Sequence, residues 1–119
     1  MKDVNILKNA GINVDAGLEL LGDMEMYDET LNDFLEESEE RLPRLKQNKE
    51  NGDMANYAID AHAMKSDSKY LGFTRLAELS LDHELKGKEN DIEYVNNHYD
   101  ELIEEASRII SVVKEYLGN

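Results

Sequence analysis

Apolar residues recur at helical spacing along nearly the whole of this 119-residue chain, and this pattern limits the folds that it can adopt. The chain holds one proline and seven glycines, and it has no alternating β-branched run of the kind that forms a strand. Turns that contain glycine separate one apolar segment from the next. The pattern therefore predicts an all-α protein.

The turns divide the chain into two short and four long helical segments. The short helices are expected within residues 4–22, and the long ones at about 26–48, 54–71, 74–86 and 91–117, with Asp15, Asp53, Thr74 and Asp91 as candidate N-caps. Gly87 is expected to end the third long helix, and Pro43 should bend the first. Short turns between long helices predict an antiparallel up-down-up-down four-helix bundle, with the short N-terminal helices packed across it, in one domain spanning residues 1–119.

Composition excludes several classes of protein. The chain has 27 acidic and 13 basic residues, and its net charge of -14 argues against nucleic acid or an anionic membrane as a partner. It has no cysteine, so disulfides and thiolate metal sites are excluded, and its histidines and carboxylates lack the paired spacing of a metal-binding bundle. No apolar span approaches the roughly 20 residues of a transmembrane helix, and the residues after Met1 do not resemble a signal peptide. We therefore expect a cytoplasmic protein without membrane insertion or a metal of its own.

The segment from Ala61 to Gly72 surrounds His62 with residues suited to phosphate chemistry. On a helix, Lys65, Ser66 and Lys69 share the face of His62, and this face carries no acidic residue. The opposite face carries the stripe that should enter the core: Tyr57, Ala61, Met64, Ser68 and Leu71. An exposed imidazole is a good nucleophile near neutral pH, and nearby lysines offset the charge of a phosphoryl group. The pattern therefore favours a phosphoryl carrier over a hydrolase.

The motif formed by Ala61-His62, Lys65, Ser68 and Leu71-Gly72 resembles that of the histidine-containing phosphotransfer (HPt) domains of multistep two-component phosphorelays. Similar residues extend over most of the chain, at 17–18, 34–35, 40–42 and 76–79. Two positions depart from the family pattern. Met64 replaces a leucine of the core stripe, which should matter little. Ser66 replaces a glycine beneath the imidazole, and we expect this change to alter the rate or the partner preference.

The resemblance implies that His62 accepts a phosphoryl group from the aspartyl phosphate of a receiver domain and passes it to the aspartate of another receiver. Lys65, Ser66 and Lys69 would support the transfer, and the receiver would bring Mg²⁺, so no cofactor is expected in this chain. The implied partners are response-regulator receiver domains and a hybrid histidine kinase. The expected docking surface consists of Ala55, Ala58 and Ile59, with Arg75 at its rim. No autonomous kinase or ATPase activity is expected, since the chain has no glycine-rich phosphate loop.

A second interpretation is a non-catalytic helical adaptor that docks a receiver without carrying phosphate. The change at Ser66 leaves it open, whereas the presence of both His62 and Lys65 argues against it. The sequence does not name the kinase, the receiver or the direction of phosphate flow. It favours a free-standing protein over a module of a larger kinase, and a monomer, because one bundle buries each apolar stripe.

Overall fold

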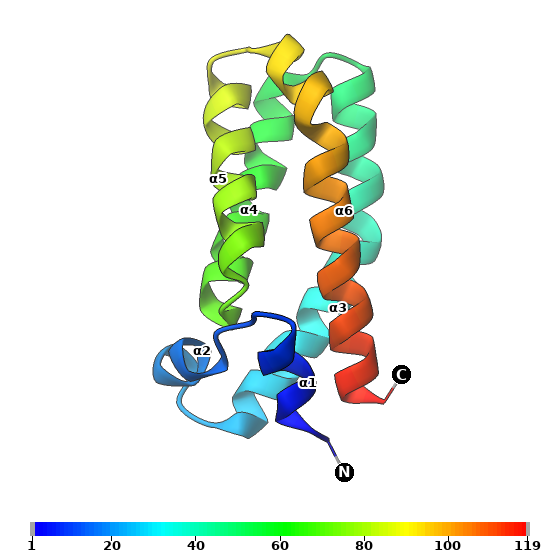
Figure 1. Ribbon diagram of the computed structural model, residues 1–119. Helices are drawn as coiled ribbons and strands as arrows, with labels where there is room; N and C mark the ends of the chain where they lie inside the picture. Colours follow the sequence, from blue (N-terminus) through cyan, green and yellow to red (C-terminus); the bar gives the residue numbers. More distant parts are fainter. Residues whose placement is uncertain (1, 119) are drawn as a thin grey trace.

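The computed structural model describes residues 2–118, and within this range the chain forms six helices and no strand (Figure 1). The helices are α1 (Val4–Asn9), α2 (Val14–Leu21), α3 (Met24–Glu50), α4 (Met54–Leu71), α5 (Thr74–Lys88) and α6 (Ile92–Leu117). The four long helices run alternately up and down, and α1 and α2 lie across one end of the bundle, α1 against α6 and α2 against α3 and α4. The predicted all-α bundle with short N-terminal helices is confirmed.

Some of the predicted N-cap residues are confirmed by the structure, and others are wrong. Asp53 and Asp91 cap α4 and α6 as predicted, each accepting a hydrogen bond from a backbone N–H three residues later. The predicted cap of α2 is wrong, because the Oδ1 atom of Asn13 accepts the hydrogen bond from the Ala16 N–H. Thr74 is the first helical residue of α5 and not its cap. Phe73 takes the cap position; its side chain has no atom that could accept a hydrogen bond, and its ring is buried in the core.

The turn between α4 and α5 is held by close backbone contact with the start of α2. Gly72 has a φ of 81°, and its carbonyl oxygen accepts a hydrogen bond of 2.8 Å from the backbone N–H of Asn13. A Cβ at Gly72 would overlap the backbone carbonyl of Asn13, which has no freedom to move away. Glycine is therefore required here for both conformation and space.

Gly87 lies inside α5 and does not end it, contrary to the prediction. The helix continues to Lys88, and Gly87 is buried against α4. A Cβ at Gly87 would lie 3.1 Å from the Cβ of Ala58 and 3.3 Å from the carbonyl oxygen of Met54. The absent side chain thus lets α4 and α5 pack closely next to His62.

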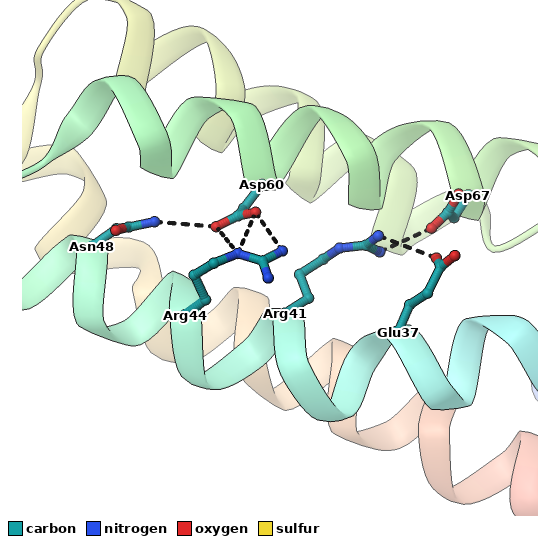
Figure 2. Close-up of polar contacts among 6 residues, drawn as sticks. All are labelled: Glu37, Arg41, Arg44, Asn48, Asp60 and Asp67. Atoms are coloured by element: carbon teal, nitrogen blue, oxygen red, sulfur yellow. Dashed lines mark hydrogen bonds and ion pairs between the residues drawn. The ribbon is translucent and has the colours of Figure 1, made fainter.

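Ion pairs join α3 to α4 along one side of the bundle (Figure 2). The guanidinium group of Arg44 donates two hydrogen bonds, of 3.0 and 2.8 Å, to the buried Asp60 Oδ1, and one of 3.1 Å to Oδ2. Arg41 lies one turn earlier and binds Asp67 at 2.9 Å. Pro43 lies between these two arginines, and α3 continues through it to Glu50. The contacts on both sides of the proline help the helix to continue past the backbone bond that it lacks.

Replacing Gly72 by alanine should destabilise the fold far more than the same change at Gly52. Both glycines have a positive φ, of 81° and 69°, so each alanine bears the strain of about 1–2 kcal/mol for a left-handed residue. Only Gly72 also meets another backbone, whereas nothing lies within 4 Å of a Cβ at Gly52. Denaturant unfolding should show a loss of about 3 kcal/mol or more for Gly72→Ala. Equal losses for the two variants would contradict the close contact with Asn13.

Candidate functional site

His62 lies in the middle of α4 with 58% of its side chain exposed, as the helical pattern predicted. Its Nδ1 atom is 2.7 Å from the Oε2 atom of Glu84, which α5 brings alongside. The same carboxylate binds the Nζ atom of Lys65 at 2.8 Å and that of Lys88 at 3.0 Å. Three groups that can carry positive charge therefore surround one carboxylate.

Glu84 is only 3% exposed, yet it is ionised at neutral pH. Burial raises its pKa, but hydrogen bonds from Lys65, Lys88 and His62 outweigh burial and lower the pKa to about 2. A buried carboxylate is stable as an anion only when donors satisfy its oxygens, and here both oxygens have donors. The carboxylate is thus a fixed acceptor at the base of the imidazole.

The contact with Glu84 determines which nitrogen of His62 carries the proton. A carboxylate only accepts hydrogen bonds, so at 2.7 Å the Nδ1 atom must donate. The ammonium of Lys65 also only donates, so its 3.4 Å approach to Nδ1 is not a second bond, and it binds Glu84 instead. In the neutral ring, the lone pair is then on Nε2, the nitrogen farther from the backbone.

Glu84 and Lys88 are the functional candidates that the sequence analysis missed. The face of α4 around His62 carries no acidic residue, as the sequence analysis stated, but α5 brings one next to the ring. A signal was present in the sequence. Small residues mark the face of α5 that packs on α4, namely Ala77, Ser80 and Gly87, and Glu84 is the charged residue at the same spacing.

An apolar groove of about 540 Å³ lies between α4 and α5 beside the imidazole. The residues of the predicted docking surface, Ala55, Ala58 and Ile59, line it together with Met54, Gly87 and Lys88. Ala58 is buried at the contact with α5, whereas Ile59 is 65% exposed. Ile59 and the groove together form an exposed apolar patch beside the imidazole, and such a patch is typical of a surface that another protein covers.

The other predicted site residues lie at different distances from the ring. Ser66 is partly exposed one helical turn after His62. Lys69 is exposed almost two turns away, next to a hollow lined in part by Asn13 and Gly72. Arg75 lies at the far end of α5, where its Nη2 atom is 3.4 Å from Glu101 of α6. The structure therefore brings Lys65 and Ser66 to the imidazole but not Arg75.

Comparison with known proteins gives the family. The family model described as the Hpt domain matches residues 29–111, which is more than half of the chain. This chain belongs to the Hpt domain family. It is also 26% identical over 98 residues to the phosphorelay intermediate protein rdeA of Dictyostelium discoideum, an alignment that covers 82% of this chain and 39% of that protein. The chain thus matches about two fifths of that relative's length, and no solved structure matches it. Both matches support the predicted histidine phosphotransfer function in a phosphorelay.

The second histidine of this Hpt domain, His83 on α5, belongs to the core. His83 is 1% exposed, and the hydroxyl of Tyr57 lies 2.8 Å from its Nδ1 atom. Its Nε2 atom donates to the backbone carbonyl of His98 at 3.2 Å, so Nδ1 accepts from Tyr57.

Within residues 2–118, no group of three or more potential ligand side chains could hold a metal ion. In the same range, no helix has the length and apolar character needed to span a membrane.

The Hpt domain should lose stability as the pH falls below about 6.5, because of His83. Burial lowers the pKa of His83, so the unfolded chain takes up the proton first and is favoured as the pH falls. We expect urea unfolding to show a lower free energy at about pH 5.5 than at about pH 7.5. The His83→Gln variant should be less stable at both values but should show a smaller difference between them, whereas His98→Gln should retain most of the difference, because burial is the main cause of the lowered pKa of His83. An unchanged difference in His83→Gln would assign the effect to another group.

Proposed function

We propose that the Nε2 atom of His62 accepts a phosphoryl group from the aspartyl phosphate of a receiver domain and passes it to an aspartate of a second receiver. In the first step the P–O bond to the aspartate breaks while the Nε2–P bond forms, and the aspartate leaves as a carboxylate. In the second step another aspartate attacks phosphorus and the imidazole leaves. The observation that carries this proposal is the exposed imidazole whose Nδ1–H is held by Glu84, because it directs the lone pair of Nε2 toward solvent.

Each neighbour of His62 has a part in the proposed transfer. Glu84 is a positioning residue that fixes the ring and its tautomer, and Lys65 supplies positive charge next to the phosphoryl group. Ser66 keeps the approach to the ring open, and Lys69 extends the positive field along α4. Mg²⁺ would come with the receiver, so this chain would use no cofactor of its own. It would have no kinase or ATPase activity by itself.

The groove beside His62 is the proposed docking site for the partners. We expect the receiver domains of response regulators and of a hybrid histidine kinase to place an apolar surface against Ala55 and Ile59. Lys65 and Lys88 would then face the phosphorylated, acidic pocket of the receiver. The Hpt domain would act as a single bundle, and these partners imply a cytoplasmic site of action.

Substitution His62→Gln should abolish phosphate transfer while leaving the fold and the docking intact. Glutamine lacks the nucleophilic nitrogen, but it is uncharged and occupies an exposed position. The measurement is labelling by a phosphorylated receiver domain with Mg²⁺ present, with a test of the product for acid lability and a parallel measurement of receiver binding. If receivers bind the wild-type protein but never label it, it is the docking-only adaptor.

Substitution Ile59→Asp should weaken receiver binding at least tenfold, since it places a charge in an apolar interface. Leu20→Asp is the matched control, because Leu20 is 59% exposed compared with 65% for Ile59 but lies on α2. Binding can be measured by calorimetry with the non-phosphorylated receiver. Arg75→Ala should leave the affinity unchanged, in accord with its distance from the groove. If Leu20→Asp weakened binding as much as Ile59→Asp, the docking surface would have to lie elsewhere.

A further inference from the structure

The carboxylate of Glu84 contacts the nitrogen of His62 that does not carry the phosphoryl group in the proposed function. Glu84 binds Nδ1, whereas Nε2 is the proposed point of attachment. The contact therefore remains available after the ring has been phosphorylated. The inference below rests on the proposed function in assigning the phosphoryl group to Nε2.

The proton on Nδ1 decides how well phosphorylated His62 releases its phosphoryl group. If the ring keeps this proton, it is an imidazolium, and breaking the N–P bond releases a neutral imidazole. If the ring loses the proton, breaking the same bond would release an imidazolate anion, which is a much poorer leaving group. A free imidazole changes protonation near pH 6.5, so without help the proton would be partly lost at neutral pH.

We propose that Glu84 retains the Nδ1 proton on phosphorylated His62, so that the ring stays an imidazolium and transfers its phosphoryl group without exchanging a proton with solvent. The buried carboxylate 2.7 Å away stabilises a cationic ring far more than a neutral amide could. The ring acquires positive charge when the N–P bond forms and loses it when the bond breaks. The proton stays on Nδ1 throughout, so both steps balance without an added acid or base.

The charges around Glu84 agree with this assignment. The charged groups that face the carboxylate are His62 and Lys65 from α4 and Lys88 from α5, and His83 lies on the buried side of α5. Before transfer, the two lysines and the one carboxylate together carry a net charge of a single positive unit. Adding a doubly charged phosphoryl group to an imidazolium makes the site neutral, whereas adding it to a ring without the proton leaves an excess negative charge next to a buried anion. The buried carboxylate thus favours the protonated ring.

The test uses phosphoramidate, a small donor that transfers its phosphoryl group and releases ammonia, so it needs no receiver. The wild type and the variants Glu84→Gln and Glu84→Asp are phosphorylated and followed by ¹⁵N NMR of the imidazole and by phosphate release as the pH is raised. Glu78→Gln is the matched control, since Glu78 is exposed on the same helix. Thermal unfolding confirms that each variant is folded.

In the wild type, Nδ1 should keep its proton to a higher pH than in Glu84→Gln, and phosphate release should change little between about pH 6 and 8. In Glu84→Gln, Nδ1 should lose its proton within this range, and release at about pH 8 should be at least tenfold slower than in the wild type. Glu84→Asp should restore part of the effect, and Glu78→Gln should behave as the wild type. Identical titrations of wild type and Glu84→Gln would overturn the proposal. If receivers fail to label His62, the proposed function is overturned. The titrations would still stand, because phosphoramidate labels the protein without a receiver.

Discussion

The site depends on the contacts of one buried carboxylate, that of Glu84. It holds the Nδ1–H of His62 and binds Lys65 and Lys88, so one anion fixes the ring and both nearby cations. Such an anion is stable in a buried position only because donors reach both of its oxygens. The donors can reach it because Gly87 has no side chain and lets α5 lie against Ala58 of α4. The lack of a side chain at Gly87, one turn after Glu84, is therefore needed to form the site.

The rest of the bundle holds α4 at fixed points along its length. At its C-terminal end, Gly72 contacts Asn13, and the hydroxyl of Tyr27 donates to the carbonyl oxygen of Leu71 at 2.6 Å. Along its middle, Asp60 and Asp67 bind arginines of α3, as Figure 2 shows. These partners belong to α3 and to the start of α2, whereas α5 packs against α4 along its length. The helix that carries His62 is thus held by three neighbouring helices, while the imidazole stays exposed to a partner.

The sequence predicted what depends on periodicity and missed what depends on packing between helices. The stripe from Tyr57 to Leu71 predicted the buried face of α4, and hence the exposure of His62, because a helix repeats every 3.6 residues. The partner of the ring comes from α5, and its position depends on how closely two helices approach. Periodicity does not give that distance, so Gly87 was taken for a helix end and Glu84 was not identified. Arg75 was assigned to the site because it is near in sequence, although α5 carries it to the far end.

Charge bears on how the proposed docking could work. The chain has a net charge of -14, so it would repel an acidic partner, such as the proposed receiver with its phosphorylated pocket, at a distance. Salt screens this repulsion beyond about 8 Å at physiological ionic strength, which leaves the local groups to decide binding. Next to His62 these are the apolar groove with Ile59, and two lysines that Glu84 only partly neutralises. The proposed transfer would therefore bring an anionic group to a face of this acidic protein where two cations are concentrated.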